Sequence, residues 1–331
     1  MKRIFVTCLA AAFSLQAAWA ETLTIYTYES FVSDWGPGPE VQKRFESQCG
    51  CTIEWVAEGD AATLLTALRL EGDAGRADVV LGLDTNLMAE AVQSGVVLEH
   101  GLGQLGFDLP IAWNDPVFVP FDYGYFAIIY DSATLTDPPA SLAELASGSP
   151  GRDLIIQDPR TSTPGLGLLL WIKAIHGDDA AEVWGILSER LLTVTQGWSE
   201  AYGLFLAGEA PMVLSYTTSP AYHQLAEDET RYKAVIFPEG HYMQIEVAAV
   251  AASTDQPELA RQFLSFVGSR DFAEIIPTTN WMYPATDAGD ALPDVFRNLD
   301  KPDVTLLLAP EDVAANRKEW IREWLEAVGT K

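Results

Sequence analysis

The sequence predicts an α/β protein made of two α/β lobes that are joined by a two-segment hinge. Short β-rich runs alternate with helical runs, the order that gives helices layered over mainly parallel sheets. Two further β-rich stretches, Val117–Tyr130 and Tyr242–Ala252, are much longer than an ordinary strand of about 5–6 residues. A strand that leaves one sheet and enters another would need such a length, so two of them indicate two lobes.

The lobe boundaries are expected to fall within these two stretches. Residues 21–122 and 247–284 would form lobe 1, and residues 123–246 and 285–331 would form lobe 2. A single large sheet with long edge strands is the alternative that the same pattern allows.

The first 20 residues have the features of a cleaved secretory signal peptide. Lys2 and Arg3 precede an apolar run from Ile4 to about Leu15, and Ala18-Trp19-Ala20 supplies the small-x-small cleavage pattern. The apolar run is shorter than the about 20 residues that a transmembrane helix needs. Cleavage is therefore expected near Ala20, and the mature chain is expected to be soluble.

The elements that follow the leader can be predicted in order. Lobe 1 opens with a βαβαβ unit, whose expected strands and helices are Thr22–Tyr28, Glu40–Gln48, Thr52–Ala57, Ala61–Gly72 and Asp78–Gly82. The last element is a helix over Pro310–Val328, because Pro310 suits a first turn and acidic residues follow it. Its apolar face should pack on the core, and it consists of Val313, Trp320, Ile321, Trp324, Leu325 and Val328.

Charge and cysteine content limit the function classes. The 331 residues carry 47 acidic and 20 basic side chains, a formal net charge of −27. Such a surface repels nucleic acid and anionic lipid, and its field favours cationic ligands. Cys49 and Cys51 remain after cleavage, and in an oxidising compartment they would pair with each other if they pair at all. A structural disulfide and two free thiols both fit the pattern.

No signature of catalysis or of a metal site is present in the sequence. The four histidines, His100, His176, His223 and His241, have no metal-ligand spacing, and no nucleophile elbow, dinucleotide fingerprint or P-loop occurs. His241 is expected to be a surface residue at a strand start. The sequence therefore predicts no catalytic residue, no metal and no cofactor.

Aromatic residues gather in turn-rich segments near predicted strand and helix ends. They are Tyr28, Trp35, Trp198, Tyr216, Tyr222, Trp281 and Tyr283. Taken singly, each is explained by ordinary packing. Together they are more informative, because α/β sheets bind ligands beyond their strand ends. Aromatic faces with a nearby carboxylate such as Asp60 suit a planar, positively charged ring.

Two segments place hydroxyl groups directly before a proline at a predicted helix start. Ser162 and Thr163 precede Pro164, and Thr217, Thr218 and Ser219 precede Pro220. Free N–H groups and hydroxyls at a helix start can hold an anion, although an ordinary capped helix has the same pattern. If both starts face one cleft, they would form a phosphate site with Arg160 as the only nearby cation.

Long segments of the chain resemble the thiamine-binding periplasmic proteins of bacterial ABC importers. They include YTYESFVSDWGPGP, QDPRTSTPGLGLLLW, GWSEAYGLFL, VLSYTTSPAYH and IPTTNWMYP. The resemblance extends over essentially the whole mature chain. It implies a type II periplasmic-binding-protein fold, related to ferric-ion binders, with the ligand held between the lobes.

The resemblance also implies a function and a set of ligand contacts. The chain would bind thiamine, thiamine monophosphate or thiamine diphosphate in the periplasm and, as a monomer, deliver it to the permease and ATPase subunits of an importer. Contacts with the ligand match Asp60, Ala61, Ser162, Thr163, Trp198, Tyr216, Thr217, Thr218 and Ser219; aromatic walls match Tyr28, Trp35, Tyr222, Trp281 and Tyr283. The turn Glu58-Gly59-Asp60-Ala61 departs from the acidic-Asp-Gly turn that is common in the family.

Two other functions remain open at the level of sequence. A thiaminase-like enzyme of related fold would need a nucleophilic cysteine, and the only mature cysteines lie together, away from the aromatic clusters. A ferric-ion binder could use Tyr216 and Tyr222, but it would give the indole rings no role.

Overall fold

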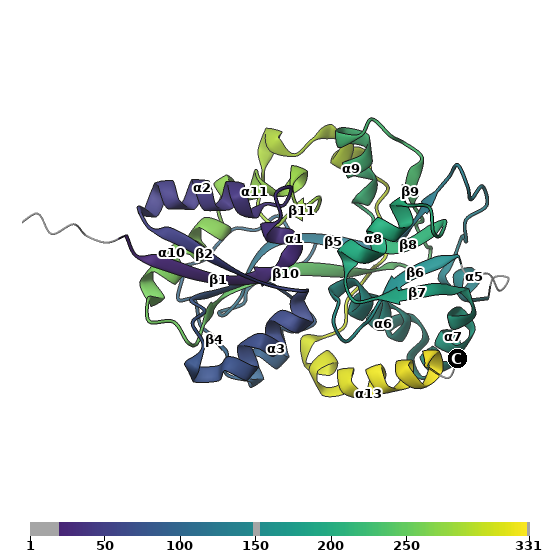
Figure 1. Ribbon diagram of the computed structural model, residues 1–331, viewed down its shortest axis with the longest axis horizontal. Helices are drawn as coiled ribbons and strands as arrows, with labels where there is room; N and C mark the ends of the chain where they lie inside the picture. The colour runs from purple at the N-terminus through teal and green to yellow at the C-terminus, as the bar shows by residue number, and fades with distance from the viewer. Residues whose placement is uncertain (1–19, 148–152, 330–331) are drawn as a thin grey trace, which may run out of the picture.

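The longest strand, β5 (Val119–Asp131), runs through the middle of the molecule and belongs to both halves of one sheet (Figure 1). Its first half pairs antiparallel with β10 (His241–Ala251), and its second half pairs antiparallel with β8 (Met212–Tyr216). The main strand order is β2-β1-β3-β10-β5-β8-β6-β7. The computed structural model describes residues 20–147 and 153–329, so residues 1–19 of the predicted signal peptide lie outside the described residues.

The first half of the sheet contains the predicted βαβαβ unit. Strand β1 pairs in parallel with β2 and β3, and β10 closes this half antiparallel to β3. The elements here are β1 (Thr22–Tyr28), α1 (Glu29–Val32), α2 (Gly38–Cys49), β2 (Thr52–Glu58), α3 (Ala61–Glu71), β3 (Val79–Asp84), α4 (Met88–Gln93), β4 (Val97–Leu98), α10 (Pro257–Val267), α11 (Arg270–Ala273) and β11 (Tyr283–Pro284).

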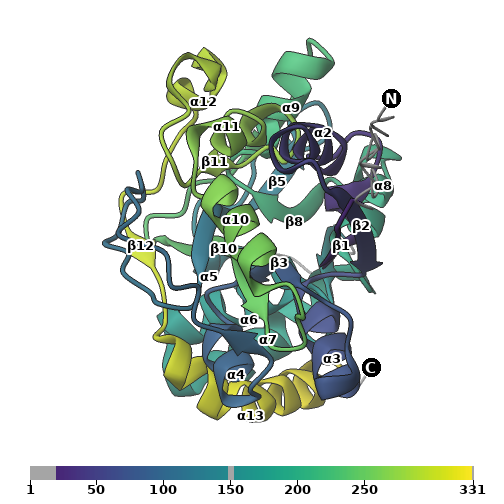
Figure 2. The ribbon, with the colours of Figure 1, turned by 90° about the vertical axis from the view of Figure 1, so that its left-hand side faces the viewer.

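Helices cover both faces of this half (Figure 2). Successive side chains of a strand point to opposite faces. Leu23 and Ile25 of β1 accordingly pack in the cluster that contains α2 and α10, whereas Tyr26 packs with α3. All three side chains are almost fully buried. The apolar run of the first strand therefore builds two separate layers of core.

The second half has the same layered plan, with strands β8, β6 and β7 in parallel pairs. Its elements are α5 (Leu142–Ser147), β6 (Leu154–Gln157), α6 (Thr163–His176), α7 (Ala180–Leu187), β7 (Leu191–Thr195), α8 (Trp198–Leu206), α9 (Ser219–Ala226), β9 (Tyr232–Ala234), α12 (Asp294–Asn298) and β12 (Thr305–Leu306). Ile155 packs with α8, and the next residue, Ile156, packs with α6.

The C-terminal helix α13 (Pro310–Val328) has the bounds that the sequence predicts and lies along the underside of the molecule (Figure 1). Trp324 meets Trp184 of α7 edge to face, with ring centroids 6.3 Å apart. Nearer the middle of the helix, Arg317 forms an ion pair with Glu90 of α4. The helix therefore contacts both halves of the sheet. The predicted apolar face is wrong at one position, because Leu325 is 37% exposed.

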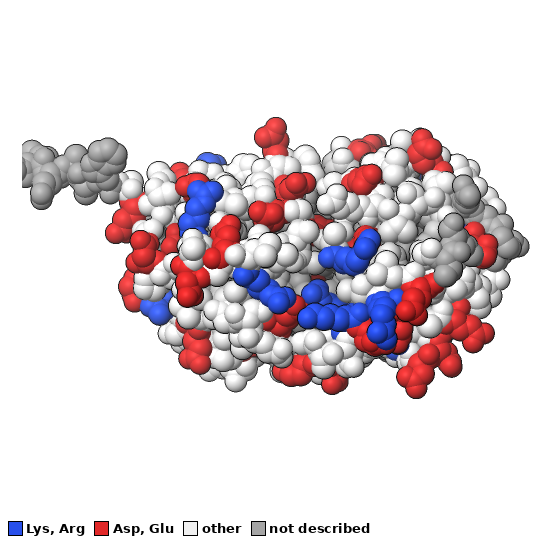
Figure 3. Space-filling model, turned by 60° about the horizontal axis from the view of Figure 1, so that its bottom comes forward, with Lys and Arg blue, Asp and Glu red and all other residues white. Residues whose placement is uncertain are grey.

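Charged side chains on the underside are mostly paired. Figure 3 shows Lys and Arg in a band on this face, with Asp and Glu beside them. Lys173 of α6 pairs with Glu323 of α13 at 2.6 Å, and Arg322 lies beside Glu319 and Glu326 within the helix. Lys173 and Arg322 thus have acidic partners.

Two expectations about individual residues can now be compared with the structure. Cys49 and Cys51 form a disulfide at the end of α2. His241 is fully buried, so its expected surface position is wrong. Its Nε2 accepts a hydrogen bond from the N–H of Phe237, and the carbonyl of Phe126 accepts one from its Nδ1. Burial lowers the pKa of His241 to about 4, so the ring is neutral at physiological pH.

The α/β fold class agrees with the prediction, although the sheet is mixed rather than mainly parallel. The two long strands that were expected at a hinge are β5 and β10. Strand β5 changes partner between Tyr125 and Phe126. The division into residues 21–122 with 247–284 and 123–246 with 285–331 remains a prediction. None of the helices in the described part of the chain is long and apolar enough to cross a membrane.

Candidate ligand-binding cleft

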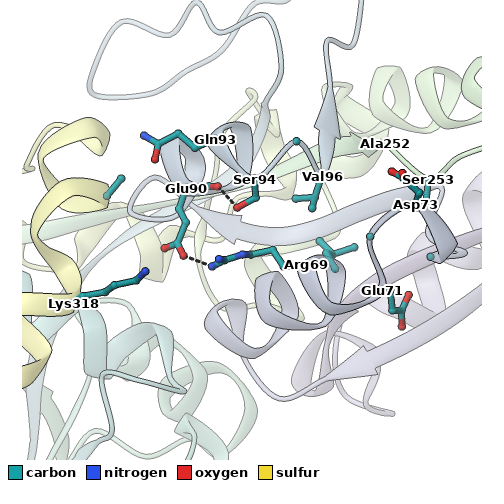
Figure 4. Close-up of a pocket in the computed structure, with 15 residues that line it drawn as sticks. Arg69, Glu71, Asp73, Glu90, Gln93, Ser94, Val96, Ala252, Ser253 and Lys318 are labelled. Atoms are coloured by element: carbon teal, nitrogen blue, oxygen red, sulfur yellow. Dashed lines mark hydrogen bonds and ion pairs between the residues drawn. The ribbon is translucent and has the colours of Figure 1, made fainter.

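Two cavities of the described structure differ in their chemistry. One, of about 430 Å³, lies between α3, α4 and α13 and is lined mostly by polar and small residues, without an aromatic ring. Figure 4 shows Arg69 and Glu90 paired at its wall, with Lys318 close by. The other has a volume of about 670 Å³ and is rich in aromatic side chains. The second cavity has the size and lining that small-molecule sites commonly show.

The aromatic cavity lies where residues from both halves of the sheet meet. Its lining consists of Tyr28, Ser30, Trp35, Asp60, Thr163, Pro164, Trp198, Ser199, Tyr202, Gly203, Leu206, Tyr216, Thr218, Ser219, Tyr222, Ala226, Gln244, Glu246, Thr278, Asn280, Trp281 and Met282. No Lys, Arg or His belongs to this described lining, whereas two carboxyl groups do. Its electrostatic character therefore favours a cation.

One wall is built from the first two turns of α8. The rings of Trp198 and Tyr202 are stacked, with centroids 5.0 Å apart. The indole N–H of Trp198 donates to the hydroxyl of Ser215, at 2.8 Å. Because stacking and a hydrogen bond both fix the indole, its orientation is set by the protein before a ligand binds.

A second aromatic pair lies on α9 and on the segment before β11. Tyr222 and Trp281 meet edge to face, with centroids 5.1 Å apart. Trp281 has a φ of 58°, in the left-handed region that a bulky residue seldom adopts. Backbone strain of this kind clusters at active sites and ligand clamps.

Tyr28, at the end of β1, reaches the inner end of the cavity. Its hydroxyl donates to Glu246 at 2.8 Å. The ring fits only because residue 82 is glycine: a Cβ there would lie 2.3 Å from Tyr28 Cδ1, and Gly82 has a φ of 102°. Gly82 of β3 therefore positions a cavity residue of β1.

Asp60 precedes α3 and faces the starts of two helices from the other half of the sheet. The hydroxyl of Ser162 and the N–H groups of Thr163 and Trp198 lie close enough to stabilise its charged form. Burial outweighs these donors and raises the pKa of Asp60 to about 6. The N–H of Ala61 reaches Thr163 Oγ1 at 3.4 Å. Asp60 thus connects α3 with α6 and α8.

The start of α9 offers another set of donors. Ser219 Oγ accepts from the N–H of Tyr216 at 3.3 Å and shares a hydrogen bond with Ser215 Oγ at 2.8 Å. The Tyr216 hydroxyl donates to Gln244 Oε1 at 2.8 Å, so it is engaged with an amide in this structure. Thr218 also lines the cavity.

The structure brings together ten of the fourteen residues that the sequence marks as a site. They are Tyr28, Trp35, Asp60, Thr163, Trp198, Tyr216, Thr218, Ser219, Tyr222 and Trp281. Four others lie outside the lining: Ala61, Ser162, Thr217 and Tyr283. Tyr283 is buried, stacks on Tyr123 at 5.3 Å and donates to the carbonyl of Phe296, so it supports the site from behind.

Several polar lining residues were missed by the sequence reasoning. Gln244, Glu246 and Asn280 form a hydrogen-bonded group with Tyr28 at the inner end of the cavity. Glu246 carried a usable signal, because it is an acidic residue inside a long apolar run. A charged residue at such a position is seldom fully buried without a special partner or function.

Comparisons with known proteins show the family to which the chain belongs. Residues 37–274 match the profile of the bacterial extracellular solute-binding proteins. The thiamine-binding periplasmic protein of Brucella suis is 53% identical over 307 residues, 93% of this chain and 92% of its own length. The thiamine-binding periplasmic protein of Escherichia coli is 53% identical, over 92% of this chain and 93% of its own. A solved structure of a periplasmic thiamin binding protein superimposes with a TM-score of 0.91 at 53% identity, covering 93% and 96% of the two chains.

Proposed function

Because the chain belongs to the bacterial extracellular solute-binding proteins, we propose that it is the periplasmic substrate-binding component of an ABC importer for thiamine. The observation that carries this proposal is a cavity of about 670 Å³ that joins aromatic walls to two acidic side chains and includes no basic residue in its described lining. Thiamine is of fitting size and carries its positive charge on a planar thiazolium ring. Aromatic faces and carboxylates are the groups that attract such a ring.

The ligand-binding residues proposed are the fourteen that the sequence marks, with the ten lining residues as direct contacts. Trp198, Trp281 and Tyr222 would enclose the rings of the ligand. Thr163 and Ser219, at the starts of α6 and α9, would face its hydroxyethyl end. Their hydroxyl and N–H donors suit an alcohol and also a phosphate. A phosphorylated ligand would share the α6 donors with Asp60, so the protein should accept thiamine and its monophosphate more readily than the more highly charged diphosphate.

Release would require the two predicted lobes to separate. Asp60 meets Thr163 and Trp198 across the cleft, and Tyr222 meets Trp281 across it as well. A hinge in β5 and β10 would open these contacts together. The closed, loaded form would dock on permease and ATPase subunits, and the binding protein itself is expected to be a monomer.

Catalysis is not part of this proposal, since the relatives are named as binding proteins. A thiaminase-like reaction would need a free thiolate at the cavity, and Cys49 and Cys51 are bonded to each other at the end of α2. Incubation with thiamine and an added nucleophile tests this directly, because release of the thiazole with formation of a pyrimidine–nucleophile adduct would establish an enzyme.

Mass spectrometry of the ligand released by denaturing the purified protein is the first test, followed by calorimetric titration of ligand-free protein with thiamine. We expect thiamine or a phosphate ester of it in the first, and one site per chain in the second. Absence of heat and of any thermal stabilisation by thiamine would overturn the proposed ligand, and an iron-dependent colour would point to a ferric-ion binder.

A further inference from the structure

Two carboxyl groups face each other at the inner end of the cavity, one from each of the two longest strands. Glu246 of β10 is paired in register with Asp122 of β5. Asp122 is 0% and Glu246 7% exposed. Glu246 lines the cavity and Asp122 does not, so Asp122 lies behind it. A ligand can therefore approach one carboxyl directly and the other only through its neighbour.

The immediate neighbours of the pair are neutral. The Tyr28 hydroxyl and the Gln244 amide donate to the two oxygens of Glu246, at 2.8 and 3.0 Å. The Asn280 amide donates to Asp122 Oδ2 at 2.6 Å and lies 3.2 Å from Glu246 Oε2. These groups orient both carboxyls and supply no positive charge.

The titratable groups near the pair on the surrounding strands are acids or phenols. Asp84 of β3 is the register partner of Glu246 on its other side, and Tyr216 of β8 donates to Gln244. Neither carboxyl of the pair forms an ion pair with a Lys, Arg or His among the described residues. Arg317 favours the charged form of Asp84 but is not among the main causes of the shifts at the pair.

Two buried carboxyl groups without a nearby cation cannot both be ionised without a large cost in free energy. Burial raises the pKa of Asp122 to about 7, and burial with the Asp122 charge raises the pKa of Glu246 well above its usual range. Glu246 favours the charged form of Asp122 as a hydrogen-bond partner, but burial outweighs this effect. The pair therefore retains at least one proton at neutral pH and titrates as a unit.

We propose that the Asp122–Glu246 pair binds the positively charged part of the ligand. The pair is protonated in the empty cleft and loses a proton to the solvent when a cation enters. This inference rests on the proposed function, because the thiazolium ring supplies the charge. An O–H bond of the pair breaks, the electron pair stays on the carboxylate, and water or buffer accepts the proton. A neutral ligand of the same shape provides no charge to stabilise the ionised pair and causes no release.

The sign of the pH dependence follows from linkage. Since binding releases a proton, higher pH favours binding until the empty pair is itself ionised. For one fully linked proton and an empty pair that titrates near pH 7, affinity should be about tenfold lower at pH 6 than at pH 8. Asp60 also has a raised pKa, of about 6, so its contribution to proton release must be separated from that of the Asp122–Glu246 pair.

The test is calorimetric titration of the ligand-free mature chain with thiamine at pH 7, in phosphate and in Tris, whose ionisation enthalpies differ. The difference in heat gives the number of protons released. We expect release from the wild type and from Asp60→Asn, and loss of most of it in Glu246→Gln. Glu258→Gln, which removes an acid of equal charge that is 89% exposed, is the matched control and should release protons as the wild type does.

A second titration uses the wild type alone, with the analogue in which a neutral thiophene ring replaces the thiazolium. It should bind with little proton release and with an affinity that does not change between pH 6 and pH 8. Thiamine that binds without proton release, or with release unchanged in Glu246→Gln, would overturn the inference and leave the proposed function standing. No binding of thiamine at any pH would overturn both.

Discussion

Tyr222 and Trp281 join the two predicted lobes across the cavity, since one lies on α9 and the other on the segment that leads into β11. Their rings stand at 78° to each other, so the edge of one ring meets the face of the other. Movement of one lobe would change the distance between the two rings directly. The same contact that shapes the cavity can thus report on whether the cleft is closed.

Removing an indole from the cavity should weaken thiamine binding without unfolding the protein. Cation–π contact contributes about 0.5–2 kcal/mol, and loss of packing adds to it. We expect Trp198→Ala and Trp281→Ala each to raise the dissociation constant at least severalfold in calorimetry. If both variants bind thiamine as tightly as the wild type, neither indole belongs to the site.

The left-handed backbone at Trp281 gives a second, independent prediction. Glycine adopts a positive φ without the steric cost of about 1–2 kcal/mol that a Cβ brings. Trp281→Gly and Trp281→Ala remove the same ring, so they should lose the same affinity. Chemical denaturation should show the glycine variant to be more stable by about 1 kcal/mol. Equal stabilities would mean that the loop relaxes and that position 281 carries no strain.

Asp60 should make the protein less stable as the pH rises. Its pKa in the folded state is about 6, against 3.8 for an ordinary aspartate, so the folded state binds more protons between these values. The free energy of unfolding therefore falls across this range, by about 3 kcal/mol at most. The Asp60→Asn variant lacks this carboxyl group, so its free energy of unfolding should not fall in this way. We expect this variant to melt higher than the wild type at pH 8 and at the same temperature at pH 4.

The same substitution should have the opposite effect on ligand binding. Asn keeps the shape of Asp60 but removes its charge, so thiamine should bind more weakly while the neutral thiophene analogue loses much less. Parallel titrations of both ligands, at a pH of 8 where Asp60 is ionised, measure the difference. Equal losses for the two ligands would make the charge incidental to binding.

The start of α6 should distinguish phosphorylated ligands. Replacing Ser162 and Thr163 together by Ala removes two hydroxyls near the expected phosphate position, so thiamine monophosphate should lose more affinity than thiamine. Because Ser162 also stabilises the charged form of Asp60, the pKa of Asp60 should rise further. Ser141→Ala, which removes a hydroxyl from the start of α5, is the control. A larger loss for thiamine would show that α6 is not a phosphate site.

The disulfide should affect stability slightly and affinity not at all. It closes a ring of only three residues, and the entropy that a cross-link removes from the unfolded chain is small for so short a loop. We expect the double variant Cys49→Ser, Cys51→Ser to lose about 1–2 kcal/mol of unfolding free energy. Its dissociation constant for thiamine should equal that of the wild type in calorimetry.

Local signals in the sequence were enough to place most elements. The alternation of strand and helix gave β1 its bounds, and a proline with acidic residues after it marked the start of α13 at Pro310. Leu325 shows the limit of periodicity, since an apolar residue next to the buried face is not itself buried unless a neighbouring element covers it. The opposite error was made for His241, which was expected at the surface. It is buried because Trp171 and Phe237, from other parts of the chain, pack against it.

The candidate site was predictable as far as its residues lie in unusual segments. Aromatic residues in turns and hydroxyl groups before prolines are unusual patterns, and both were recognised in the sequence. Asp122 and Glu246 did not, although each is an acidic residue within a long apolar stretch. Their importance depends on register, and the pairing of Glu246 with Asp122 follows from the position of β10 between β3 and β5. Such long-range pairing is decided by the whole sheet and not by a neighbouring residue.

The place of β10 in the sheet also has a consequence for the synthesis of the protein. Strand β10 lies between β3 and β5, so the first half of the sheet cannot close until residue 251 has been made. Long-range pairing of this kind makes folding slow. A nascent chain therefore cannot complete its fold until late in synthesis, and an incompletely folded polypeptide can pass through a narrow export channel. Delayed folding is thus built into the topology of a protein that works outside the membrane.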